Sequence, residues 1–150
     1  MFSKVTGDVD SWLGKILDAI ENSNNKGLKD RTIVITSSDH GDFSGDYGCV
    51  EKWPGGVDDV LTRVPLIINV PKGYGGGTHL QTNAPVQLFD VMATVLDYAG
   101  IKPKHTHFAQ SLASIVNTGK VTAAQQSRYV FSEGGYLYPT EVSGTMKAWQ

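Results

Sequence analysis

Residues 32–41 read Thr-Ile-Val-Ile-Thr-Ser-Ser-Asp-His-Gly. The first five are β-branched and mostly apolar, which is typical of a short strand buried on both faces of a parallel sheet. Asp39 and His40 follow at the carboxyl end of this strand, where open α/β sheets place their ligand sites. Adjacent side chains of a regular strand point to opposite faces. Both groups therefore reach one ion only if the strand breaks, and Gly41 allows that break.

A carboxylate beside an imidazole supplies half of a site for a divalent cation. Calcium takes six to eight oxygen-rich ligands, and zinc takes four protein ligands or three with water. The same residues fit a simpler interpretation, in which Asp39 caps a turn and His40 hydrogen-bonds the backbone. Spacing alone favours the simpler interpretation.

The sequence around this strand alternates helical and strand patterns. Apolar residues recur at helical spacing over 5–20 and 86–99, and a shorter helix is predicted over 111–116. Residues 64–70 and 129–132 are apolar runs typical of further strands. This order predicts an α/β fold, a layered sandwich with a mostly parallel sheet. Three strands make a thin sheet, so we expect residues 1–150 to form a single partial domain.

Composition excludes several classes of function. Thirteen basic against fifteen acidic residues give a net charge of −2, so no nucleic-acid partner is expected. No apolar run approaches the ~20 residues of a membrane span. The single cysteine, Cys49, excludes Cys-rich zinc sites and CxxC redox chemistry. The glycines of 73–77 lack the spacing of nucleotide-binding loops.

Several motifs, in a fixed order, resemble the sulfatase family of the alkaline-phosphatase-like superfamily. They are a helix over 9–20, the strand ending Ser-Asp-His-Gly at 38–41, Gly45-Asp-Tyr-Gly48, Lys52, Thr62-Arg-Val-Pro-Leu-Ile-Ile68, a helix over 89–101 and Gln110-Ser-Leu112. The resemblance spans roughly residues 5–133, and the agreement in order makes it far more specific than any single motif. Tyr47 stands where the family often has His, and Ala109 stands where it usually has Gly.

The resemblance implies roles for individual residues. Asp39 and His40 would be ligands of a divalent cation, usually calcium in this family, with manganese or zinc as alternatives. Lys52 would contact the sulfate group of the substrate as a catalytic and substrate-binding residue. We expect Arg63 to form a structural ion pair with Asp58 or Asp59. The remaining histidines, which lie outside the motifs, are expected at the surface: His79, His105 and His107.

The family's nucleophile motif, Cys/Ser-x-Pro/Ala-x-Arg, has no counterpart in this sequence. Val-Glu-Lys-Trp follows Cys49, so Cys49 cannot be the residue converted to formylglycine. The chain thus resembles the carboxyl-terminal part of a sulfatase catalytic domain without its nucleophile half. We expect metal-assisted hydrolysis of sulfate esters, from a small molecule or a glycan, only within a longer chain, with the isolated fragment inactive.

Two other classes of function stay open. One is a phosphodiesterase, phosphonate hydrolase or phosphoethanolamine-transferase-like member of the same superfamily. The other is a non-catalytic remnant or partner-binding module. Loss of half a sheet would expose apolar strands, so self-association or pairing with the missing half through the sheet edge is also expected. The sequence assigns no compartment: no signal peptide is visible, although the family is often exported or periplasmic.

Overall fold

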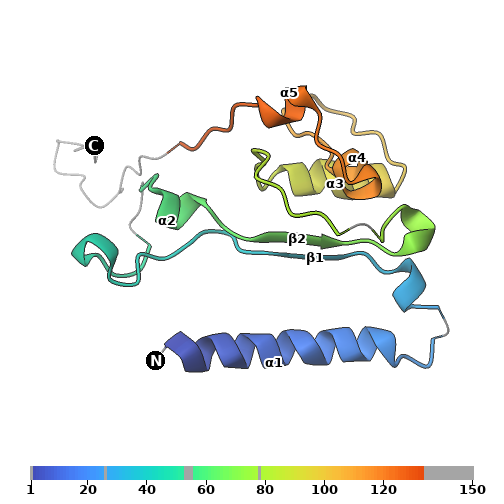
Figure 1. Cartoon of the computed structure of the whole chain (residues 1–150), viewed down its shortest axis with the longest axis horizontal. Coiled ribbons are helices and arrows are strands. Elements are labelled where there is room, and N and C mark those ends of the chain that lie inside the picture. The colour runs from blue at the N-terminus through green and yellow to red at the C-terminus, as the bar shows by residue number, and fades with distance from the viewer. Residues whose placement is uncertain (1, 26, 53–55, 78, 134–150) are drawn as a thin grey trace.

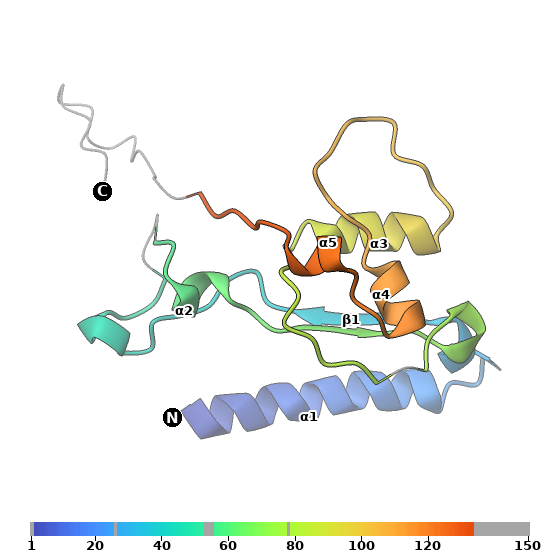
Figure 2. The ribbon, with the colours of Figure 1, turned by 45° about the horizontal axis from the view of Figure 1, so that its top comes forward.

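The computed structural model describes residues 2–25, 27–52, 56–77 and 79–133. A sheet of two strands, β1 (Val34–Ser37) and β2 (Leu66–Asn69), lies between helices. One side of the sheet faces the long helix α1 (Phe2–Glu21), as Figures 1 and 2 show. The other side faces α3 (Asp90–Tyr98), α4 (Ala113–Thr118) and α5 (Ala123–Gln126). Short turns of helix complete the order: η1 (Lys29–Arg31), η2 (Asp46–Gly48), α2 (Asp59–Thr62) and η3 (Lys72–Tyr74).

The pairing of the two strands corrects the expected parallel topology. β1 and β2 run antiparallel, with Ile35 opposite Ile68 and Ser37 opposite Leu66. In the described residues of their connection, 38–52 and 56–65, the helical turns η2 and α2 are the only regular elements. It therefore returns the chain to the end of the sheet that it left (Figure 1). A parallel pair would need a crossover to the opposite end, which is usually made by a longer helix.

The expected third strand is absent. Residues 129–132 are described, and they belong to no strand. Instead, the side chain of Gln87 donates a hydrogen bond to the carbonyl oxygen of Phe131 at 2.9 Å. Apolar sequence favours a strand only where a neighbouring strand offers ladder partners, and the described part of the chain places none beside this segment.

Two helices begin a few residues later than the sequence predicts, and a polar side chain near the start of each accepts a hydrogen bond from the backbone. The predicted helix over 86–99 starts only at Asp90, whose Oδ2 accepts a hydrogen bond from the amide of Gln87 at 2.8 Å. The predicted helix over 111–116 runs instead from Ala113 to Thr118, and Ser111 Oγ accepts a bond from the amide of Ala113 at 3.2 Å. Side-chain acceptors of this kind compete with backbone helical pairing in the turn before each helix.

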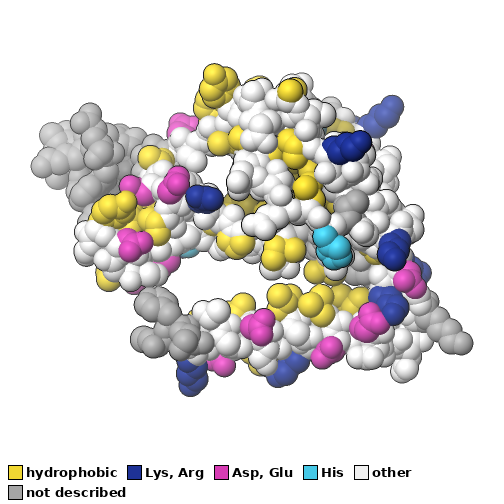
Figure 3. Space-filling model, in the orientation of Figure 1, with side chains coloured by type: hydrophobic (Ala, Val, Ile, Leu, Met, Phe, Trp, Pro, Cys, Tyr) yellow, Lys and Arg dark blue, Asp and Glu magenta, His cyan; other side chains and the backbone are white. Residues whose placement is uncertain are grey.

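Burial is uneven between the two sides of the sheet. The buried apolar residues lie on the α3–α4 side and around the connection between the strands: Phe43, Leu61, Val70, Ala84, Ala93, Leu112, Ala113 and Ile115. On α1, by contrast, Val9 is 63 % exposed and Ile16 is 57 % exposed. Figure 3 shows an open gap between α1 and the rest of the molecule, with hydrophobic side chains along it. The amphipathic helix forms as predicted, but its apolar face is not buried.

Within the described ranges, no helix is both long enough and apolar enough to cross a lipid bilayer.

Candidate functional site

The chain turns sharply where β1 ends. The backbone amide of His40 donates to Asp39 Oδ1 at 2.9 Å, and Ser38 Oγ donates to the carbonyl oxygen of His40 at 2.8 Å. These local bonds replace the strand ladder, which ends at Ser37. The side chains of Asp39 and His40 consequently leave a bend rather than a regular strand, as the sequence predicted.

Gly41 is required here for space. Its amide donates to the carbonyl oxygen of Leu61 at 2.8 Å, which joins the bend to α2. A Cβ at this position would lie 1.8 Å from the carbonyl oxygen of Val60, closer than real Cβ contacts allow. The sequence predicts that Gly41 supplies unusual backbone angles, but its φ lies outside the left-handed region. Close approach of the neighbouring backbone explains the glycine instead.

Asp39 and His40 are brought together. Oδ2 of Asp39 lies 3.5 Å from Nε2 of His40, with the two side chains 84 % and 40 % exposed. Nδ1 of His40 lies 2.7 Å from the carbonyl oxygen of Gly41. Because a carbonyl only accepts, this bond requires a proton on Nδ1, and in the neutral ring the lone pair is then on Nε2, the nitrogen nearer Asp39. A backbone carbonyl commonly fixes a metal-binding imidazole in this way.

The environment keeps the Asp39 carboxyl ionised. Its pKa lies below the ordinary value of 3.8, mainly because the backbone amide of His40 donates to the carboxylate. When the His40 ring is protonated, its positive charge acts in the same direction. Hydrogen bonds and nearby positive charge both favour the charged form of a carboxyl group. Asp39 is therefore anionic throughout the neutral range, as a cation ligand must be.

The pair fits a divalent cation, but only as part of its ligand set. Two ligands about 2.3 Å from one ion can lie 3.5 Å apart, as Oδ2 of Asp39 and Nε2 of His40 do. Among the described residues, no group of three or more His, Cys, Asp or Glu side chains is placed to hold a metal. Two donors leave most of the coordination shell of a hard cation to water or to other protein groups.

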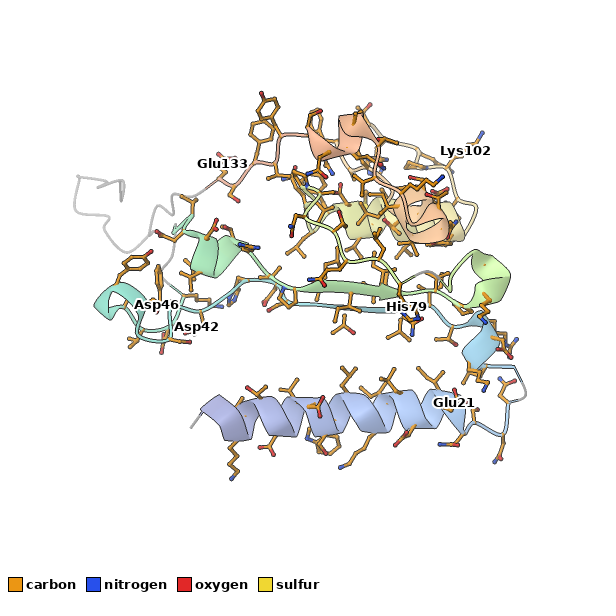
Figure 4. The ribbon with its side chains drawn as sticks, viewed as in Figure 1. Glu21, Asp42, Asp46, His79, Lys102 and Glu133 are labelled. Atoms are coloured by element: carbon orange, nitrogen blue, oxygen red, sulfur yellow. The ribbon has the colours of Figure 1, made fainter. Side chains whose placement is uncertain are left out.

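Lys52 lies in the connection between the strands and is exposed. Within the described part of the chain it forms no hydrogen bond or ion pair with Asp39 or His40. Its backbone position is set by the loop before it, where the amide of Phe43 donates to the carbonyl oxygen of Glu51 at 3.1 Å. Figure 4 shows Asp42 and Asp46 on this same loop, beyond the carboxyl end of β1.

Arg63 does not form the expected ion pair. In the described residues its guanidinium pairs with neither Asp58 nor Asp59. Its backbone amide donates to the carbonyl oxygen of Asp59 at 2.8 Å, which closes α2. The side chain instead lines a cleft of about 770 Å³, together with Asp39 and Asp59.

An ion pair that the sequence does not predict connects α3 to the segment after α5. Arg128 donates to both carboxylate oxygens of Asp90, at 2.5 and 3.0 Å. Asp90 is fully buried and also accepts from the amides of Gln87 and Gln110, each at 2.8 Å. Asp90 falls within the helix predicted over 86–99, but nothing in the sequence links it to Arg128.

The remaining histidines lie away from this bend. His79 and His105 are exposed, as expected, but His107 is half-buried. The rings of His105 and His107 meet edge to face with centroids 5.9 Å apart. Nδ1 of His107 is buried and has no hydrogen-bond partner in the described structure.

A family model described as Sulfatase matches residues 5–101. The chain belongs to the sulfatase family. Sulfatases hydrolyse sulfate esters and generally use a divalent metal, and the α/β class is that of the family.

Named relatives match nearly all of the chain. It is 31 % identical over 137 residues to an N-acetylglucosamine-6-O-sulfatase of Bacteroides thetaiotaomicron, covering 90 % of this chain and 23 % of that protein. It is 28 % identical over 147 residues to a sulfatase of Formosa agariphila, covering 91 % of this chain and 27 % of that protein. Arylsulfatase K of Danio rerio is 28 % identical to the chain over 127 residues, and the match covers 84 % of this chain and 23 % of that protein. No solved structure matches the chain significantly.

The chain thus spans about a quarter of the length of these sulfatases.

Proposed function

We propose that this chain is one part of a sulfatase catalytic domain and takes part in metal-assisted hydrolysis of a sulfate ester within a longer protein. The observation that carries the proposal is the Asp39–His40 pair at the end of β1, with its two donor atoms 3.5 Å apart. Membership of the sulfatase family supports the reaction class.

Asp39 and His40 would hold the cation. Calcium is the favoured ion because the family generally uses it, and the ionised carboxylate of Asp39 is a ligand that a hard cation prefers. The imidazole of His40 would also suit manganese or zinc. When bound, the cation stabilises the negative charge of the sulfate group as the ester bond breaks.

Lys52 would supply a second positive charge to the sulfate group. An ammonium on a flexible four-carbon stem suits a tetrahedral anion, since it donates in several directions without a fixed plane. Its exposure leaves it free to approach a bound anion. We therefore assign Lys52 to substrate binding and to stabilisation of charge that develops in the transition state.

The nucleophile lies outside this chain in our proposal. No Cys/Ser-x-Pro/Ala-x-Arg motif occurs among the 150 residues. A formylglycine formed at such a motif would belong to the rest of the longer protein. Electrostatic groups without a nucleophile leave the covalent route unavailable, so we expect the isolated chain to have little turnover.

The apolar face of α1 would be covered by the rest of the sulfatase domain. Val5, Val9, Trp12 and Ile16 are each more than half exposed, and Ile67 on β2 is 61 % exposed. Each strand of a two-stranded sheet also has one edge without a described partner. The relatives are about four times longer than their matched parts, so enough chain exists in them to cover both surfaces.

Calorimetric titration of the purified chain with CaCl₂ tests the proposal. We expect weak binding, lost in both Asp39→Asn and His40→Ala. Asp10→Asn, which removes an exposed carboxylate from α1, should bind calcium as the wild type does. Equal binding by all four proteins, or binding by none, would refute the assigned cation site and favour a non-catalytic remnant.

A further inference from the structure

A cleft adjoins the proposed cation site at Asp39. Of the three residues assigned to the reaction, only Asp39 lines it, whereas His40 and Lys52 do not. A sulfate group held at Asp39, His40 and Lys52 would therefore direct the alcohol part of the ester into this cleft. Its volume of about 770 Å³ lies in the range of small-molecule sites. This inference rests on the proposed function.

The other walls of the cleft suit a ring with polar substituents. Phe89 and Phe131 line it with side chains that are 43 % and 77 % exposed, so each offers an apolar surface to a ligand. Asn83 also lines it and carries an amide that both donates and accepts hydrogen bonds. Ligand sites commonly combine apolar area with a few polar groups that fix orientation.

Among the described residues that line this cleft, Arg63 alone carries a permanent positive charge. Its backbone is fixed by the bond from its amide to the carbonyl oxygen of Asp59 at 2.8 Å. Its guanidinium is exposed and forms no ion pair with any described residue. A guanidinium binds carboxylate or sulfate groups through two parallel hydrogen bonds.

We propose that Arg63 determines specificity by binding an anionic substituent on the alcohol part of the sulfate ester. The favoured substrates would then be rings that carry a carboxylate or a second sulfate in addition to the group that is hydrolysed. Asp59 and Asp39 oppose an anion in the same cleft. Arg63 would favour the anion through two hydrogen bonds at contact distance, whereas the two carboxylates would repel it only through exposed charges that water screens.

Two matched probes without a sulfate group test this role. Methyl glucuronide and methyl glucoside differ mainly in one carboxylate, and their affinities follow from amide NMR shifts of Thr62, Val64 and Asn83. We expect the wild type to bind the glucuronide about fivefold more tightly, the difference that one exposed charged contact makes. Arg63→Gln should bind both equally, and Arg63→Lys should keep part of the preference.

Arg31→Gln is the control, because Arg31 donates to Asn25 at 2.9 Å and does not line the cleft. It should keep the wild-type preference. Equal wild-type affinities, a preference that survives Arg63→Gln, or no shift with either sugar would each overturn the inference. Repeating the titration in EDTA separates this site from the cation site, since neither probe needs a metal. The preference for glucuronide should persist there even if calcium binding fails.

Discussion

The guanidinium of Arg128 binds both carboxylate oxygens of Asp90, which lies 38 residues earlier in the chain. Asp90 is fully buried, and its own carbonyl accepts a bond from Thr94 Oγ1 at 2.7 Å. Thr94 Oγ1 in turn accepts from the amide of Leu112 at 2.9 Å. Asp90 and Thr94 therefore join α3 to the segment that leads into α4, and the Asp90 carboxylate joins α3 to Arg128.

Arg128→Met should lower the free energy of unfolding by about 3–5 kcal/mol, because it leaves the buried Asp90 carboxylate without its counter-charge. Urea denaturation followed by circular dichroism measures the change. Lys29→Met is the control, since the Lys29–Glu21 pair is exposed and its loss should change the free energy of unfolding far less. Similar losses in the two variants would contradict the role of the buried pair.

Gly41→Ala should destabilise the chain by about 1–3 kcal/mol, because the added methyl group would meet the carbonyl oxygen of Val60. Gly14→Ala is the matched change. A Cβ at Gly14 meets nothing within 4 Å, and the residue lies inside α1. The free energy of unfolding of Gly14→Ala should rise by about 0.5–1 kcal/mol, because alanine has the higher helix propensity. Thermal denaturation compares the two, and a neutral Gly41→Ala would show that the bend does not need the glycine.

The carboxyl of Asp39 should titrate below its ordinary pKa of 3.8. A depressed folded-state pKa stabilises the fold above the unfolded pKa, and this contribution is lost as the pH falls through the folded value. Carbon-13 NMR of the carboxyl signal measures the midpoint. His40→Ala should leave the pKa of Asp39 depressed, because the backbone amide, the larger cause, remains. An Asp39 midpoint at or above 3.8 would contradict the local geometry.

The isolated chain should self-associate through α1 when nothing else covers its apolar face. We expect the sedimentation coefficient to rise with concentration, and the dye ANS to fluoresce in its presence. Val9→Glu and Ile16→Glu place charges on this face and should reduce both effects. Lys4→Glu also changes an exposed residue of α1 and serves as the control. A wild type that stays monomeric at every concentration would argue against an uncovered interface.

The sequence predicted local features better than pairings between distant residues. Helical spacing in 5–20 predicted α1, and the β-branched run before Ser37 predicted β1, because both signals are local. The antiparallel direction of β2 depends on where residues 38–65 lead the chain, which no periodicity encodes. The meeting of Asp39 and His40 followed from a bend beside Gly41. The spacing of residues along the sequence does not predict the ion pair between Arg128 and Asp90, because a buried ion pair depends on tertiary packing.

Mn²⁺ titration followed by amide NMR tests the cation site most directly, because this paramagnetic ion broadens signals only near its binding position. The proposal predicts early broadening at residues 38–41, and its loss in both Asp39→Asn and His40→Ala. Broadening that begins elsewhere, or that survives both substitutions, would contradict a shared cation at the end of β1.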